Sequence, residues 1–427
     1  MSERGASAGT AGVRPRILFI SHSGMGGALL SLQYLVEALD RERFEPVVAF
    51  MYEVPEVMEA FRRAGIETLH TPEIGIFPHT TGGWNPLLTP AGLFRALRSV
   101  RAFGAAARAT EALVRRVKPD VVHLNSLVLA PSAAGARAAG AKVVWHVRES
   151  VHPGHAGVRR RWLGRLLRRW ADVAVFVSND DRRRLTGGDF GVVIPDSVDH
   201  ARFDRALDGA PVRAELGIPA GAPTVLFFGG VSSLKGAHVF LPALLRARKT
   251  IPDLHAVIAG AEGPWSRSLV ARAARAVLPL LGTGTERQRF LRTYREGGME
   301  GWVRLLTFRD DPERLIAAAD LVVFPSTQPH SARPVIEAGA MATPVVTSRL
   351  GGVEELVDDG RTGLLVPPHD PAALGDAMAR VLGDPELARR MGEAGFAASA
   401  RFAERPNVER QIALYDALLG GAAPRPG

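Results

Sequence analysis

The chain has 427 residues, a formal net charge of +9 and hydrophobic residues at 46% of its positions, with a mean hydropathy of +0.04. This length and composition predict two or three domains with large packed cores. The sequence contains no cysteine, which excludes disulfides, thiolate metal sites and cysteine nucleophiles, and no apolar run approaches the roughly 20 residues of a transmembrane helix.

Arginine dominates the charge and is concentrated in two segments, residues 94–118 and 158–170. The second segment interleaves arginines with leucine and tryptophan and predicts a basic amphipathic helix, a type that lies on anionic membrane surfaces. An ordinary helix that packs its apolar stripe on a sheet is the favoured alternative, so peripheral contact with a membrane stays open. No recognition motif accompanies the charge, so nucleic acid is not an expected partner.

The first half of the chain alternates apolar strands with helices. Residues 1–14 contain arginines and small residues but no apolar run, which predicts a disordered lead and not a signal peptide. We therefore expect a cytoplasmic location. If the basic helix docks on a membrane, the location would be the inner face of that membrane. The expected strands are residues 16–21, 45–50, 67–69, 120–124, 142–147 and 172–178.

Polar residues and glycines follow three of these strands, at the edge where parallel sheets bind ligands. Gly26 and Gly27 follow the first strand, and Asn125 follows the fourth. The fifth ends in His146, Arg148 and Glu149. A lone histidine in a strand is more often a packed core residue than a catalyst, and that alternative stays open.

A loop between residues 72 and 90 contains His79 and Trp84. Loops of this length inside compact domains are often functional, so both residues are candidates for a binding site.

The second half opens with a strand at residues 224–228, followed by a glycine-containing loop that includes Gly230 and Lys235. Glycines admit phosphate oxygens close to backbone N–H groups, and a lysine reaches a pyrophosphate as a point charge. A surface lysine at a turn is the alternative.

Residues 321–368 repeat a strand–loop–helix pattern twice, with strands at residues 321–324 and 344–347. Pro334 opens the first helix, whose first turn holds Glu337, and Gly351 and Gly352 lead into a second helix near Val353. Two helix N-termini at one sheet edge predict a phosphate site. A carboxylate beside that site suits the two hydroxyls of a ribose, although Glu337 could instead only complement the helix dipole.

The segment PVIEAGAMATPVVTSRLGGVEELVDDGRTGLLVPP resembles the donor-binding half of glycosyltransferase family 4, a retaining family with the GT-B fold. The resemblance implies an α/β chain of two Rossmann-like domains that face each other across a cleft. The expected divisions are an N-terminal acceptor-side domain at residues 15–203, a nucleotide-sugar-binding domain at 204–400, and at 401–427 a last helix that crosses back to the first domain, followed by a tail.

The resemblance also implies roles for particular residues. Glu337 matches the second glutamate of the family's Glu-x7-Glu pattern, whereas Pro329 replaces the first, with Gln328 beside it as a substitute. Lys235 matches a lysine that stabilises the leaving diphosphate, and Gly230 replaces its usual arginine partner. The catalytic set implied is His146, Lys235 and Glu337. The donor-binding set is Gly26, Gly27, Gly230, Lys235, Gln328, Arg333, Pro334, Glu337, Gly351 and Gly352, and the acceptor-side set is His79, Trp84, Asn125, Arg148 and Glu149.

The function implied is retaining transfer of a sugar from a nucleoside-diphosphate sugar to an acceptor, which could be a polysaccharide, a lipid-linked molecule or a small molecule. The departing phosphate would act as the base, and no cofactor or metal is expected, because no Asp-x-Asp stands at a strand end. The missing glutamate and arginine leave three alternatives: atypical transfer chemistry, nucleotide-sugar epimerisation, and a non-catalytic binding scaffold.

Overall fold

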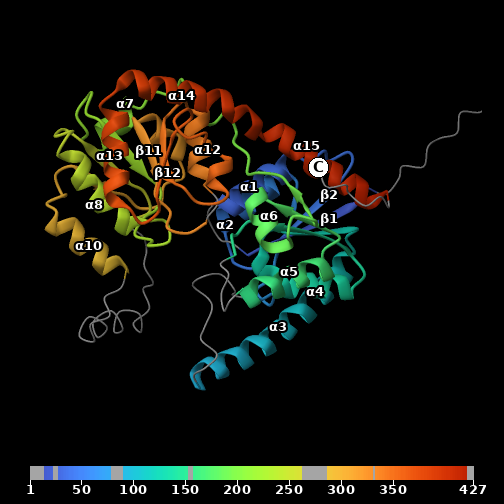
Figure 1. The fold of residues 1–427 in the computed structure, drawn as a ribbon. Coiled ribbons are helices and arrows are strands. Elements are labelled where there is room, and N and C mark those ends of the chain that lie inside the picture. Colours follow the sequence, from blue (N-terminus) through green and yellow to red (C-terminus); the bar gives the residue numbers. More distant parts are fainter. Residues whose placement is uncertain are drawn as a thin grey trace, which may run out of the picture. The chain divides into compact units, whose positions relative to one another are not determined.

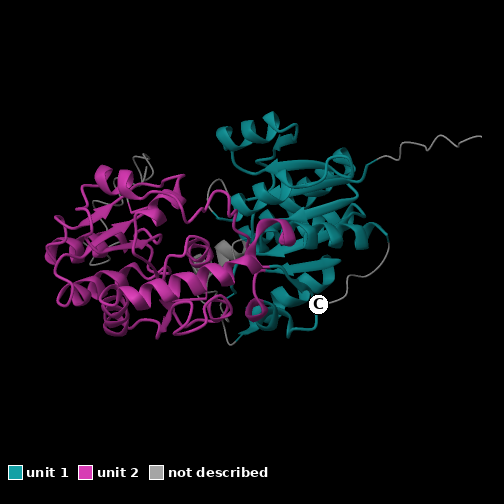
Figure 2. Ribbon diagram, turned by 90° about the horizontal axis from the view of Figure 1, so that it is seen from above, with its two compact units in different colours: residues 1–176, 182–194, 408–427 teal, residues 177–181, 195–407 magenta. Residues whose placement is uncertain are grey.

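The computed structural model describes residues 14–22, 27–77, 90–151, 157–261, 286–329 and 332–420, with only the backbone for 90–97. These residues belong to two compact units (Figure 2). Unit 1 comprises residues 1–176, 182–194 and 408–427, and unit 2 comprises residues 177–181 and 195–407. The candidates Gly26, His79 and Trp84 lie outside the described residues.

Unit 1 is built on a parallel sheet, which in the described residues has seven strands in the order β3-β2-β1-β4-β5-β6-β7. Its sequences, such as RILFIS and KVVWHV, are nearly continuous apolar runs because both faces of a parallel sheet are covered. The strands are β1 (Arg16–Ser21), β2 (Glu45–Phe50), β3 (Glu67–His70), β4 (Val121–Leu124), β5 (Lys142–Val147), β6 (Val173–Phe176) and β7 (Val192–Val193).

Helices cover both faces of this sheet (Figure 1). One face packs against α1 (Gly27–Glu37), α2 (Pro55–Arg63) and α15 (Glu404–Leu419). The other packs against α3 (Pro90–Val117), α4 (Ala130–Ala138), α5 (Val158–Trp170) and α6 (Asn179–Thr186). Side chains alternate between the two cores along each strand, so that Leu18 and Ile20 enter one core while Ile17 and Phe19 enter the other.

Unit 2 repeats the architecture on a parallel sheet that has six strands in the described residues, in the order β10-β9-β8-β11-β12-β13. The strands are β8 (Thr224–Phe227), β9 (His255–Ile258), β10 (Val303–Leu305), β11 (Leu321–Phe324), β12 (Val345–Ser348) and β13 (Leu364–Val366). One face packs against α8 (Ala237–Arg248), α10 (Glu286–Glu296), α13 (Pro371–Leu382) and α14 (Pro385–Ser399). The other packs against α7 (Ala210–Glu215), α11 (Pro312–Ala317) and α12 (Arg333–Ala340).

One expected element differs in the structure. The helix predicted after Gly352 is only a three-residue 3-10 turn, η4 (Val353–Glu355), because Gly352 has a φ of +85° and Asp358 begins a new turn at once. The last helix, α15, begins at Glu404 and includes Pro406, because a proline is tolerated in the first turn of a helix. Among the helices in the described part of the chain, none is long and apolar enough to cross a bilayer.

Candidate functional site

The strand order of unit 2 places its candidate site between β8 and β11. These two strands are neighbours, and the chain runs outward from them in opposite directions, to β9 and β10 on one side and to β12 and β13 on the other. At such a switch point the loops after the two central strands separate, and ligands bind at the carboxyl edge between them. The loop after β8 carries Lys235, and the element after β11 carries Glu337.

Hydrogen bonds tie the two loops together. The Thr327 amide donates to the Leu234 carbonyl at 3.0 Å, and the Ser326 hydroxyl donates to the same oxygen at 3.0 Å. The Thr327 hydroxyl donates to the Ser233 carbonyl at 2.9 Å. Lys235 is therefore held beside the β11–α12 loop by its own backbone neighbours.

Lys235 is half-buried at this edge, and its Nζ lies 3.4 Å from the Phe228 carbonyl oxygen. Burial lowers the pKa of its ammonium group. The electrostatic attraction between this ammonium group and an approaching anion would be strong, because the group is partly desolvated and its partner is a neutral carbonyl.

Gly230, in the same loop, has a backbone that accepts no side chain in this conformation. Its φ is +56°, and a Cβ there would lie 2.5 Å from the Gly260 carbonyl oxygen. The Gly230 amide donates to the Ala259 carbonyl at 3.1 Å, which fixes this close approach. In this loop conformation, position 230 therefore has no space for the arginine expected from the family resemblance.

Glu337 is buried in α12 as one half of an ion pair. The helix begins at Arg333, so Glu337 lies at the start of its second turn, and Arg333 Nε donates to Glu337 Oε1 at 2.7 Å. The two residues are 7% and 5% exposed. Burial raises the pKa of Glu337, which Arg333 and Arg202 partly oppose by their charges and Asp196 reinforces.

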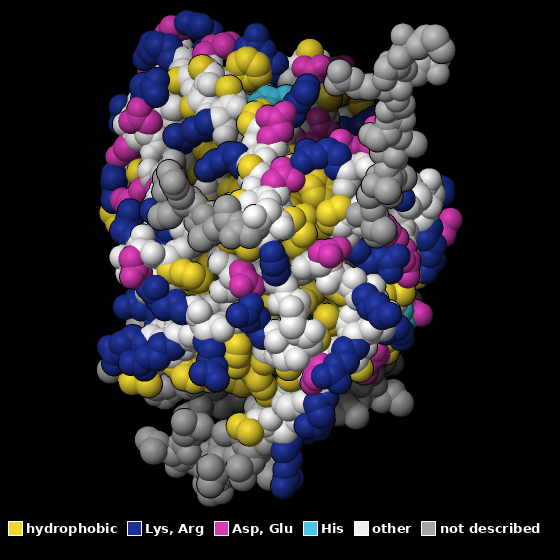
Figure 3. Space-filling view, turned by 90° about the vertical axis from the view of Figure 1, so that its right-hand side faces the viewer, with side chains coloured by type: hydrophobic (Ala, Val, Ile, Leu, Met, Phe, Trp, Pro, Cys, Tyr) yellow, Lys and Arg dark blue, Asp and Glu magenta, His cyan; other side chains and the backbone are white. Residues whose placement is uncertain are grey.

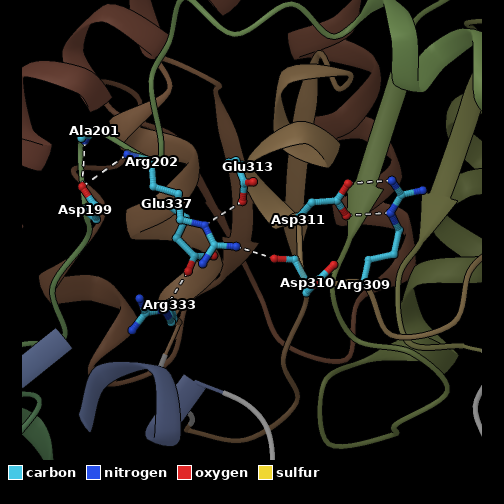
Figure 4. Close-up of polar contacts among 9 residues, drawn as sticks. All are labelled: Asp199, Ala201, Arg202, Arg309, Asp310, Asp311, Glu313, Arg333 and Glu337. Carbon is cyan, nitrogen blue, oxygen red and sulfur yellow. Dashed lines mark hydrogen bonds and ion pairs between the residues drawn. The ribbon is translucent and has the colours of Figure 1, made fainter. Parts of the chain in front are cut away.

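Arg202 was not among the candidates from the sequence, yet Figure 4 shows it beside Glu337. Its Nε donates to Glu313 at 3.0 Å, and its Nη2 donates to the Asp310 carbonyl. The Asp199 carboxylate caps the turn before it by accepting from the Ala201 amide at 2.9 Å. The only sequence signal was its position after Asp199, in the segment that closes the first half of the chain.

A small cavity lies beside α12 in unit 2. Its lining includes Ser178, Asp196, Ala332, Ile336 and Gly352. A Cβ on Gly352 would lie 3.3 Å from Ser178 Oγ, so the glycine keeps this cavity open.

The remaining donor-side candidates lie around the same edge. Pro334 occupies the first turn of α12, and the Gln328 carbonyl accepts from the Ser326 hydroxyl at 2.7 Å. The amides of Val353 and Glu354 both donate to the Leu350 carbonyl. These two amides are therefore already paired, whereas the first amides of a long helix would be free to bind a ligand. The long helix expected here is therefore wrong, whereas the phosphate site at this edge and the donor contacts of Gly351 and Gly352 stay predictions.

In unit 1 the corresponding switch point lies between β1 and β4. Arg148 Nε donates to Asn125 Oδ1 at 2.7 Å, and Asn125 Nδ2 donates to the Ala28 carbonyl at 2.9 Å, next to Gly27 at the start of α1. Glu149 accepts from the Leu127 amide at 2.9 Å and from the Ser126 hydroxyl. The structure thus brings the acceptor-side candidates Asn125, Arg148 and Glu149 to one edge.

His146 lies deeper than that edge, within β5, and is 3% exposed. Neither ring nitrogen has a hydrogen-bond partner among the described residues, and the ring of His123 is 5.7 Å away. Burial, together with the charge of Arg148, holds the pKa of His146 well below its ordinary range. The catalytic role implied for His146 stays a prediction, and the structure shows the imidazole as buried.

Within the described residues, no group of three or more histidine, aspartate or glutamate side chains is arranged to hold a metal ion.

Two sequence-family models match consecutive parts of the chain. "Glycosyltransferase Family 4" matches residues 25–202, and "Glycosyl transferases group 1" matches residues 210–397. The chain belongs to glycosyltransferase family 4.

Several curated relatives of this family-4 chain are D-inositol 3-phosphate glycosyltransferases. The Corynebacterium urealyticum protein is 33% identical over 219 residues, which are 50% of this chain and 47% of that protein. The Corynebacterium jeikeium protein is 34% identical over 233 residues, 53% of this chain and 51% of that protein. The matched part thus spans about half of each relative's length.

Solved structures confirm the expected GT-B fold. The Anabaena HepE protein in complex with UDP and glucose superposes with a TM-score of 0.73 at 21% identity, covering 94% of this chain and 100% of that chain. The Thermosynechococcus elongatus sucrose-phosphate synthase gives 0.71 at 22% identity, covering 96% and 100%.

Proposed function

We propose that the chain is a retaining glycosyltransferase that transfers a sugar from a nucleoside-diphosphate sugar, with unit 2 binding the donor. The observation that carries the proposal is the position of Lys235 and Glu337 on the two loops that flank the β8/β11 switch point. One is a cation suited to a diphosphate, and the other is a carboxylate suited to the two hydroxyls of a ribose. Family membership and the UDP and UDP-glucose complexes of HepE support this reading.

In this proposal Lys235 stabilises the negative charge that develops on the leaving diphosphate. Its burial strengthens that interaction because fewer waters screen the charge. A departing phosphate oxygen then takes the proton of the acceptor hydroxyl as the new bond forms on the same face of the sugar. The proposal asks for no divalent cation, and the edge of unit 1 formed by Asn125, Arg148 and Glu149 is its acceptor side.

The test is a titration of the purified protein with UDP-, GDP- and ADP-sugars, following binding by calorimetry and nucleoside diphosphate release by a coupled assay, with and without EDTA. One donor is expected to bind and release its diphosphate slowly, with EDTA having no effect. Lys235→Ala should weaken diphosphate binding about 10- to 100-fold, the range for a charge-assisted hydrogen bond. Glu337→Gln should weaken nucleoside diphosphate binding without changing the affinity for pyrophosphate, which has no ribose.

Lys249→Ala is the matched control, because Lys249 is exposed at the other end of α8, the helix that follows Lys235. If the Lys249→Ala and Lys235→Ala variants bind the nucleoside diphosphate with the same affinity, the assigned donor site is wrong. A donor that binds with full affinity but never releases diphosphate, with or without added acceptors, would instead support a non-catalytic binding protein. That second candidate draws its support from Gly230 and Pro329, where a cation and a carboxylate were expected.

A further inference from the structure

The outward face of α5 combines exposed cations with large exposed apolar side chains. Arg161, Arg165 and Arg169 are exposed, and Val158 and Trp162 are 57% and 37% exposed. The positions of these five residues, 158, 161, 162, 165 and 169, follow the helical repeat and place them on one side of the helix. The opposite side packs into the unit 1 core through Leu163, Gly164 and Leu167.

The arginines of this face have no acidic partners in the described part of the chain. No ion pair is formed by Arg161, Arg165 or Arg169 with a described residue, and the sequence of α5, VRRRWLGRLLRRW, contains no acidic residue. Some exposed arginines elsewhere do pair within their own helix, as Arg389 and Arg390 pair with Glu386. The arginines of α5 have no such partner, because this helix contains no acidic residue.

α3 extends the same surface. Its exposed arginines Arg98, Arg101, Arg108 and Arg116 form no ion pair with a described residue, and Val100 is 68% exposed. The one acidic residue of α3, Glu111, pairs with Arg115 at 2.6 Å.

Aromatic contacts fix α3 beside α5. Phe103 of α3 lies 5.9 Å from Trp170 of α5, and Phe77 lies 5.6 Å from both Phe103 and Trp162. Since both helices pack on the same face of the sheet, their outward sides lie on the same side of unit 1. In Figure 3, Lys and Arg side chains gather with hydrophobic ones on the lower part of the molecule, the level at which α3 lies in Figure 1.

We propose that the outward sides of α3 and α5 form a docking surface for an anionic phospholipid bilayer. Such a bilayer complements both components of the surface. Its headgroups attract the arginines, and its interface accepts tryptophan and valine side chains at the depth of the headgroups. A nucleic acid would satisfy the arginines but would leave Val158 and Val100 in water.

The test is co-sedimentation of the full chain with large unilamellar vesicles of pure POPC or of POPC with 30% POPG, at 50 mM and 500 mM NaCl. The chain should sediment with the anionic vesicles at low salt, weakly at high salt, and not with pure POPC. Each arginine near an anionic surface contributes about a factor of five, so Arg161→Gln/Arg165→Gln/Arg169→Gln should weaken partitioning about 100-fold.

The matched control is Arg289→Gln/Arg292→Gln/Arg295→Gln, which removes three exposed arginines from α10 in unit 2 and should bind vesicles like the parent. Trp162→Ala should remove most of the binding that survives 500 mM NaCl. Equal loss in the two triple variants would refute the docking surface, as would binding that ignores the lipid charge. If a DNA duplex binds as tightly as the vesicles and Trp162→Ala changes neither, the face binds polyanions and the bilayer proposal fails.

Discussion

Gly230 shows at the scale of one residue how backbone geometry limits the chemistry of a site. The positive φ and the nearby Gly260 carbonyl leave no space for a side chain at this position. In this loop conformation residue 230 provides no cation, so in the proposed function Lys235 stabilises the diphosphate without a second one. Replacing the glycine by the arginine expected from the family should therefore damage the fold and not improve the site.

Gly230→Ala is expected to lower the free energy of unfolding by about 3 kcal/mol, from the left-handed backbone and the clash together. Gly221→Ala is the control, because Gly221 has a φ of +76° but nothing within 4 Å of an added Cβ. Gly221→Ala should lower the free energy of unfolding by about 1 kcal/mol. Urea unfolding measures both values, and equal losses would show that the Gly260 carbonyl moves away at no cost.

The contribution of Glu337 to the free energy of unfolding should decrease as the pH rises. An ordinary ion-paired carboxylate, whose pKa is lowered by folding, shows the opposite dependence. Its pKa is raised in the folded state, chiefly by burial, so the folded chain holds this proton more tightly than the unfolded chain. The stability that it contributes is present below about pH 4.3, the pKa of an exposed glutamate, and is lost as the pH rises through the folded pKa.

Relative to the parent, Glu337→Gln is therefore expected to gain stability as the pH rises across that window, by at most about 1.4 kcal/mol per pH unit. Urea unfolding between pH 4.5 and 8 measures the difference. Glu393→Gln, which removes an exposed carboxylate paired with Arg205 at 3.1 Å, is the control and should run parallel to the parent. A Glu337→Gln curve that also runs parallel would mean that Arg333 fully compensates the burial.

At the scale of elements, α15 completes one core of unit 1. Tyr415 is fully buried there, packs edge-on against Phe19 and Phe44, and its hydroxyl lies 2.7 Å from His123 Nδ1. Burial lowers the pKa of His123 to about 3, so its ring is neutral at physiological pH and takes part as a polar core group. A helix from the end of the chain thus provides the hydrogen bond of a histidine in a central strand.

Tyr415→Phe should lower the free energy of unfolding by about 1–3 kcal/mol, because it leaves His123 Nδ1 buried without its partner. Tyr52→Phe is the control, since Tyr52 is 53% exposed in the same unit, and it should have no effect. Thermal or urea unfolding gives the comparison. An unchanged stability in Tyr415→Phe would mean that another group or a water satisfies the histidine.

At the scale of the whole molecule, the chain forms two units that each have cores of their own. The last helix belongs to unit 1 by its contacts, although unit 2 precedes it in the sequence. A chain that ends at residue 407 would therefore lose core side chains from unit 1 and leave the sheet of unit 2 intact.

Hydrogen exchange measured by mass spectrometry should show this difference between the units. In the chain that ends at residue 407, amides of β1 and β4 should exchange faster, because α15 no longer covers that face, while β8 and β11 keep their protection. A chain that ends at residue 420, which retains α15, is the control. Equal loss of protection in β8 and β11 would show that the two units unfold together.

Much of the fold was predictable because it depends on local patterns. Continuous apolar runs such as RILFIS and LVVF identify buried parallel strands, and Pro334 marks the start of a helix. The short turn after Gly352 was not predictable, since a glycine pair followed by VEEL is equally typical of a helix start. Asn125 was found because a parallel sheet brings all its carboxyl ends to one edge. Lys235 was chosen over an ordinary surface lysine because of the family resemblance.

The sequence by itself determined the class of fold, the family and the set of strand-end residues, because periodicity and motif spacing are properties of neighbouring residues. Only the tertiary structure decided which partners those residues meet. It paired Arg333 with Glu337, brought Arg202 beside them, closed position 230 to any side chain, and buried His146 beside His123. These outcomes depend on contacts between segments far apart in the chain and on the space left after packing, and no local pattern records either.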